Sequence, residues 1–117
     1  MNIDFNVDRW EKVRETYGKW WKGELERPLI PVVLRGRDPG REQPDAPYLT
    51  QQTCADRSIP AEGIVDRIEY ELSKLYFLGD AFPQFNMDCF GPGIAAAFLG
   101  AELDNTKGRV WFRPVEI

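Results

Sequence analysis

The alternation of amphipathic segments with short apolar runs is the sequence feature that most restricts the fold. Residues 6–22 and 58–78 repeat apolar side chains every three or four positions, which predicts two helices. The segments expected to be strands are 27–36, 84–89 and 109–117, and a third, short helix is expected over 91–100. An α-β-α-β-α-β order is typical of an α/β fold with parallel strands.

The first predicted helix has recognisable start and stop signals. Asn6 is placed to cap it, and Phe5 and Trp10 are spaced for a hydrophobic staple. Gly23 can end it in the left-handed conformation. Its three tryptophans fit a stripe that faces the core, and the alternative is an exposed docking helix.

The first predicted strand is apolar along nearly its whole length, as in a strand covered on both faces. Pro28 and Pro31 restrict it to an edge, or move regular pairing beyond Pro31. Residues 36–57, rich in proline, glycine and charge, are expected to form a long loop of the kind that is functional or mobile.

Composition narrows the classes of protein. The 117 residues suffice for one modest domain, and a net charge of −4 with a pI near 4.9 argues against a nucleic-acid partner. No apolar stretch has the roughly 20 residues of a membrane span, and the N-terminus lacks a signal-peptide pattern. Cys54 and Cys89 form no CxxC pair, so we expect structural thiols in a reducing, cytoplasmic setting.

The chain contains no histidine. Ser-His-Asp triads, Cys-His dyads and histidine-ligated metals are therefore excluded within it. Any acid–base chemistry must come from carboxylates, arginine, lysine, tyrosine or cysteine.

A glycine-rich stretch follows the second predicted strand. Gly91-x-Gly93-x-x-Ala96 formally matches a dinucleotide-binding fingerprint. Pro92 removes one of the backbone N–H groups that would hold a pyrophosphate. A strand-to-helix turn is the favoured interpretation, and a nucleotide-binding half-domain is the weaker one.

Asp88 and the pair Arg35 and Arg37 are the candidate functional residues. Each lies at the end of a predicted strand, and functional groups gather at the carboxyl ends of parallel strands. A carboxylate facing two arginines would suit an ion-paired or carboxylated ligand. The alternative is that Asp88 caps the following helix or pairs with one arginine structurally.

These motifs resemble the N-terminal third of uroporphyrinogen decarboxylase-like proteins. The resemblance rests on "RPLIPVVLRGR", residues 27–37, and on "FPQFNMDCFGPGIAAAFLGAEL", residues 82–103. Arg27-Pro28 matches the start of the family's first strand, and Asp88 falls on its aspartate. Two departures are "RGRDPGR" in place of the family's Arg-Gln-Ala-Gly-Arg and Met87 in place of a serine.

The resemblance implies a fold and a function. It implies the N-terminal portion of a (β/α)8 TIM barrel with an extra N-terminal helix: residues 1–117 as one partial domain, divided into 1–26 and 27–117. It assigns Asp88 a catalytic role, and Arg35 and Arg37 binding of an anionic small-molecule substrate. It implies no cofactor in this chain; cobalamin, zinc or a corrinoid-protein partner belongs only to the methyltransferase branch.

We therefore expect a fragment of a lyase or methyltransferase that is inactive alone, because a barrel site draws on many strand ends. The alternative is a non-catalytic module that self-associates into a homo-oligomer through its apolar faces.

Overall fold

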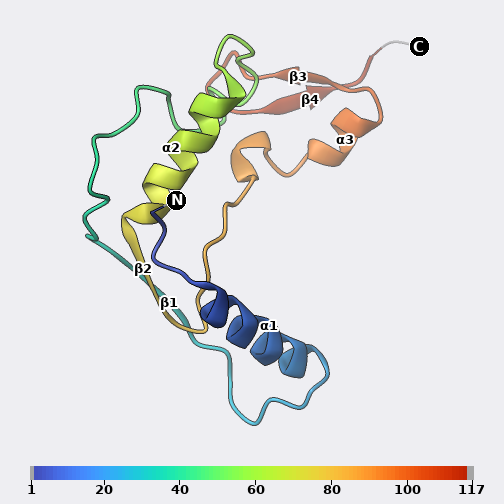
Figure 1. Cartoon of the computed structure of the whole chain (residues 1–117). Coiled ribbons are helices and arrows are strands. Elements are labelled where there is room, and N and C mark those ends of the chain that lie inside the picture. The colour runs from blue at the N-terminus through green and yellow to red at the C-terminus, as the bar shows by residue number, and fades with distance from the viewer. Residues whose placement is uncertain (1, 116–117) are drawn as a thin grey trace. The chain divides into compact units, whose positions relative to one another are not determined.

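The computed structural model describes residues 2–115 (Figure 1). Its helical elements are α1 (Val7–Trp21), α2 (Ala61–Ser73), the 3₁₀ turn η1 (Asp88–Phe90) and α3 (Ile94–Phe98). Its strands are β1 (Pro31–Arg35), β2 (Leu75–Gly79), β3 (Glu102–Asp104) and β4 (Trp111–Arg113). The chain divides into two compact units: unit 1 runs to Gln43 and includes Ile68–Gln84, and unit 2 holds Pro44–Arg67 and the chain from Phe85 onward.

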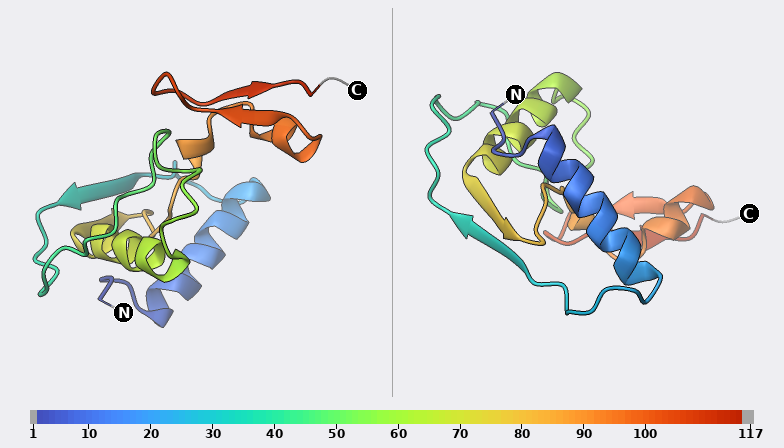
Figure 2. Two further views of the ribbon diagram at one scale, coloured as in Figure 1. Left: turned by 90° about the horizontal axis from the view of Figure 1, so that it is seen from above. Right: turned by 60° about the horizontal axis from the view of Figure 1, so that its bottom comes forward.

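The described residues form two separate two-stranded sheets, and both are antiparallel. β1 pairs with β2 from Pro31↔Gly79 to Arg35↔Leu75. In the right view of Figure 2 the teal arrow of β1 and the yellow arrow of β2 run in opposite directions. The expected parallel α/β sheet, and with it the N-terminal portion of a TIM barrel, is therefore wrong. A barrel fragment would join its strands through crossovers into one parallel sheet.

The observed fold first differs from the expected one within residues 58–78, for which the sequence predicts a single helix. The helix α2 ends at Ser73, whose hydroxyl donates to the carbonyl oxygen of Tyr70 at 2.7 Å. After Lys74 the chain becomes β2, an aliphatic and aromatic run that suits a strand. Periodicity cannot separate the two states here, because Leu72 and Leu75 continue the helical stripe into the strand.

The predicted strand 84–89 is also wrong. Residues 81–87 have no regular structure, and Asp88 begins η1. The predicted strand 109–117 is confirmed over β4, which pairs with β3, and its last two residues lie outside the described part of the chain. β3 was not expected, because three residues are too short to show an alternating pattern.

The helix α1 is confirmed, with both of its predicted start signals. Asn6 Oδ1 accepts the N–H of Arg9 at 2.9 Å, and the rings of Phe5 and Trp10 meet edge to face at 4.9 Å. The tryptophans do not form a buried stripe, since Trp10, Trp20 and Trp21 are all exposed. The helix instead packs in unit 1 through Phe5, which contacts the ring of Phe77, and through Tyr17, whose hydroxyl donates to the carbonyl oxygen of Asp80.

Little apolar surface is buried in either unit. Among the described residues, the buried apolar side chains are Phe77 and Ala81 in unit 1 and Cys89 in unit 2. Cross-strand partners in the β1–β2 sheet lie on the same face, and the residues on one of its two faces are exposed. We call this the open face; its residues, between 38% and 57% exposed, are Ile30, Val32, Leu34, Tyr76 and Leu78.

Within residues 2–115, no helix has both the length and the apolar character needed to cross a membrane.

Candidate functional site

The two predicted substrate-binding arginines lie together in unit 1. Arg35 is the last residue of β1; its side chain is exposed and makes no hydrogen bond or ion pair within residues 2–115. Arg37 is half-buried, and its Nη1 donates to the carbonyl oxygens of Asn2 and Ser73 at 2.8 and 2.7 Å. The backbone between them is fixed, because the N–H groups of Gly36 and Arg37 both donate to the carbonyl oxygen of Lys74.

Asp88, the predicted catalytic residue, belongs to unit 2. It is exposed and begins η1 rather than ending a strand, so the strand-end argument for its position is wrong. Its carbonyl oxygen accepts the N–H of Gly91 at 2.8 Å, and Gly91 has a φ of +71°, which favours glycine. The structure thus brings Arg35 and Arg37 into one unit and Asp88 into the other.

Gly93 has a packing role. A Cβ at this position would lie 2.8 Å from Cδ2 of Phe112, so only glycine lets the ring of Phe112 approach. The helix that follows, α3, has five residues. These features support the turn interpretation of Gly91-x-Gly93-x-x-Ala96.

A group of charged residues in unit 1 was missed by sequence reasoning. We call it the Asp80 cluster; it comprises Arg9, Lys12, Arg27 and Asp80. Asp80 directly follows β2 and is only 7% exposed. Arg27 grips it with two hydrogen bonds, Nη1 to Oδ2 at 2.6 Å and Nη2 to Oδ1 at 2.8 Å, and the N–H of Ile30 donates to Oδ2 at 2.8 Å.

These contacts set the charge state of Asp80. The hydrogen bonds from Arg27 and then from Ile30 lower the pKa of Asp80 from 3.8 to about 2, against the opposing effect of burial. The same contact raises the pKa of Arg27. The carboxylate is therefore ionised at neutral pH and has both oxygens occupied.

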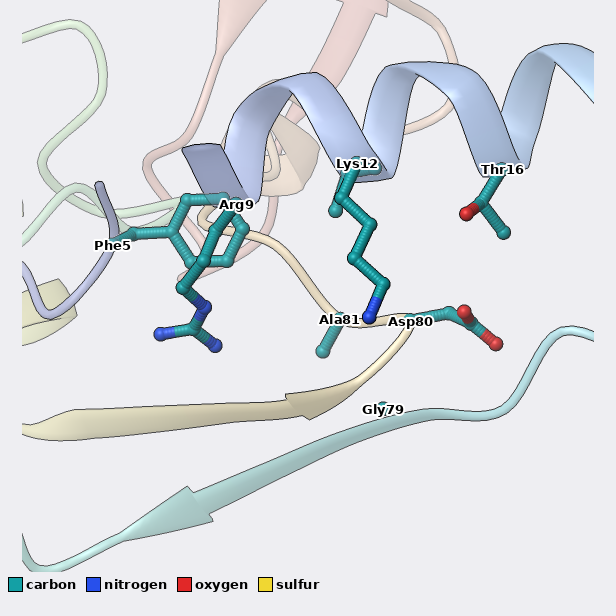
Figure 3. A pocket seen from close by; sticks show the side chains of 8 residues that line it. Phe5, Arg9, Lys12, Thr16, Gly79, Asp80 and Ala81 are labelled. Atoms are coloured by element: carbon teal, nitrogen blue, oxygen red, sulfur yellow. The ribbon is translucent and has the colours of Figure 1, made fainter. Parts of the chain in front are cut away.

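A small hollow lies between α1 and the end of β2 (Figure 3). It measures about 130 Å³, and Arg9, Lys12 and Asp80 are among its lining residues. The guanidinium of Arg9 is already satisfied, because it donates to the carbonyl oxygens of Asp4 and Phe77 and lies 4.4 Å from the ring centroid of Phe5. Lys12, one turn further along α1, points toward Ala81 and Asp80 and forms no ion pair within residues 2–115.

The signal that could have revealed this cluster is the Gly79-Asp80 pair after an apolar run. Gly79 has a φ of +57°, and the N–H of Asp80 donates to the carbonyl oxygen of Ile30, so the pair closes the strand and turns the carboxylate toward Arg27. Assigning residues 58–78 to one helix concealed it.

Comparison of the chain with protein families, with curated proteins and with solved structures found no match. Residues 2–115 contain no group of three or more potential metal ligands among cysteine, aspartate and glutamate.

Proposed function

We propose that this chain is part of an enzyme with the function of the uroporphyrinogen decarboxylase-like proteins, of the decarboxylase or the corrinoid-linked methyltransferase branch, in the cytoplasm. The proposal concerns the function alone, because the two antiparallel sheets are not part of a barrel. The observation that carries the proposal is the exposed guanidinium of Arg35, held on a fixed backbone at the end of β1. Five N–H donors in a rigid fork suit recognition of a substrate carboxylate. The free thiols of Cys54 and Cys89 are compatible with a reducing compartment.

The other two predicted residues have narrower roles in this proposal. Arg37 uses both N–H groups of Nη1 on backbone carbonyls, so only Nη2 and Nε remain for a substrate. Asp88 is exposed, and in this proposal its carboxylate stabilises positive charge on a reacting group.

The open face supports the view that this chain is inactive alone. An exposed apolar face is a common feature of surfaces that contact another polypeptide. In this proposal the covering polypeptide is the rest of the enzyme, which also supplies the remaining groups of the active site.

Uroporphyrin, the stable oxidised form of a porphyrinogen and a polycarboxylate, is the probe that tests the Arg35 assignment. Binding is followed through the porphyrin fluorescence. We expect Arg35→Gln to weaken binding about fivefold, the effect of losing one partly solvated charged hydrogen bond. Arg14→Gln is the matched control, because Arg14 is exposed on α1 and, among the described residues, its ion-pair partner is Glu11. Equal affinities for the two variants, or no binding by the wild type, would contradict the proposal.

Self-association is a second candidate function, favoured by the open face itself. Its five side chains amount to a few hundred Å² of apolar surface, below the roughly 800 Å² per partner of a standard interface. A second copy would therefore bind weakly.

Sedimentation equilibrium distinguishes this function from the first. If a second copy covers the open face, mass rises with concentration, and Leu34→Lys abolishes the rise. Val65→Lys is the control, because Val65 is 63% exposed on α2 and is not part of the open face. A wild type that stays monomeric at every concentration rules this candidate out.

A further inference from the structure

Three members of the Asp80 cluster, Lys12, Arg27 and Asp80, also line a second, larger hollow. This hollow has a volume of about 410 Å³, and its lining residues are Lys12, Arg27, Ile30, Val32, Gly79 and Asp80. It shares Lys12, Gly79 and Asp80 with the hollow drawn in Figure 3. Its volume falls within the range of small-molecule sites.

The polar side chains that line this hollow are two cations, Lys12 and Arg27, and one carboxylate, Asp80. Lys12 brings three N–H groups and no ion-pair partner within residues 2–115. Arg27 is half exposed; its Nη1 is occupied by Asp80 and by the carbonyl oxygen of Pro28, but Nη2 keeps one free N–H and Nε keeps another. Among the described lining residues Asp80 is the one carboxylate, and it accepts three hydrogen bonds from Arg27 and Ile30.

The lining also has an apolar part. Ile30 and Val32 line the hollow with 57% and 38% of their surface exposed, and both belong to the open face. A ligand that lies on them would remove apolar surface from water, which favours binding. The hollow thus joins a positively charged end to an apolar surface.

We propose that this hollow binds a small amphiphilic carboxylate, whose head group meets Lys12 and Arg27 and whose short hydrocarbon part lies on Ile30 and Val32. The site does not use Arg35, but its apolar wall belongs to the open face, so a polypeptide that covered Ile30 and Val32 would compete with the ligand. Arg27 is held in place by Asp80, so the head group meets a preorganised guanidinium and one mobile ammonium.

Titration of the chain with sodium octanoate, followed by the backbone amide signals of Ile30, Val32 and Gly79 in NMR spectra, tests the proposal. Acetate carries the head group alone, and 1-octanol carries the tail alone. We expect octanoate to bind more tightly than either, because only it contacts both walls. Equal binding of acetate and octanoate would overturn the proposal, since simple charge attraction would then suffice.

Matched variants locate the site. Lys12→Gln is expected to raise the octanoate Kd about fivefold, whereas Lys22→Gln, an equal charge change at the exposed C-terminal end of α1, changes it less than about twofold. Threonine is similar to valine in volume but more polar, so Val32→Thr should weaken the binding of octanoate and leave the binding of acetate unchanged. Arg35→Gln should leave octanoate binding intact. Equal effects of the two lysine variants, or octanoate shifts at residues outside the hollow, would refute the site.

Discussion

At the scale of the residue, Gly79 and Asp80 together connect the end of β2 to the segment that precedes β1. Gly79 adopts a φ of +57°, and a Cβ there would collide with the carbonyl oxygen of Ile30. Asp80 then ties the segment before β1 to the end of β2 through Arg27 and Ile30. Two adjacent residues thus supply both the turn and the ionic contact.

Gly79→Ala is expected to destabilise the chain by about 1–3 kcal/mol, because alanine is strained at this φ and has no room beside Ile30. Gly18→Ala, inside α1 with nothing within 4 Å of the new Cβ, should instead stabilise by up to about 1 kcal/mol. Urea unfolding measures both. If both substitutions changed the free energy of unfolding in the same direction, the positive φ of Gly79 would not be the cause of the difference.

Asp80→Asn is expected to lower the free energy of unfolding by about 1–3 kcal/mol at neutral pH, since it removes a charged acceptor that three N–H groups share. The folded-state pKa near 2 lies below the ordinary 3.8, so the stabilisation is fully present above pH 4 and disappears as pH falls toward 2.

The stability gap between the wild type and Asp80→Asn should therefore narrow across that pH range, which urea titrations at several pH values would measure. A gap that stays constant from pH 6 to pH 2 would contradict the assigned contact.

At the scale of the element, α1 depends on its cap and on a few aromatic contacts. It has no buried residue, so packing contributes less to it than to most helices. The Asn6 side chain and the Phe5–Trp10 contact therefore carry more of its stability.

Asn6→Ala is expected to lower stability by about 1 kcal/mol and to reduce helical circular dichroism, because the N–H of Arg9 loses its acceptor. Asn6→Asp keeps an acceptor and should match the wild type. Equal losses in the two variants would mean that the side-chain oxygen is not the cap.

At the scale of the whole molecule, the described residues bury few apolar side chains and leave the open face in water. A compact chain of 117 residues has a heat-capacity change of unfolding of about 1.4–1.8 kcal/mol/K. Because this quantity follows the apolar surface buried, we expect a smaller value here.

Calorimetry on the Leu34→Lys variant, in which self-association is suppressed, provides the measurement. A heat-capacity change within the compact range would mean that the open face is covered within one chain.

The sequence by itself determined features that depend on neighbouring residues. The start of α1 at Asn6, its aromatic staple and the glycine turn at Gly23 follow from local hydrogen bonds and backbone freedom. Pro31 marked an edge strand correctly, since β1 is the edge of a two-stranded sheet. The position of Arg35 at the end of a strand followed from the apolar run before it, and its substrate-binding role stays a prediction.

Only the tertiary structure decided what depends on partners distant in the chain. Leu75–Gly79 is a strand because it pairs antiparallel with β1, and this pairing takes the place of the expected parallel sheet. Asp80 became the centre of a charged cluster because that pairing carried it to Arg27, 53 residues away. Strand direction and long-range ion pairs leave no periodic trace in the sequence, since they depend on which segments meet rather than on the pattern within either one.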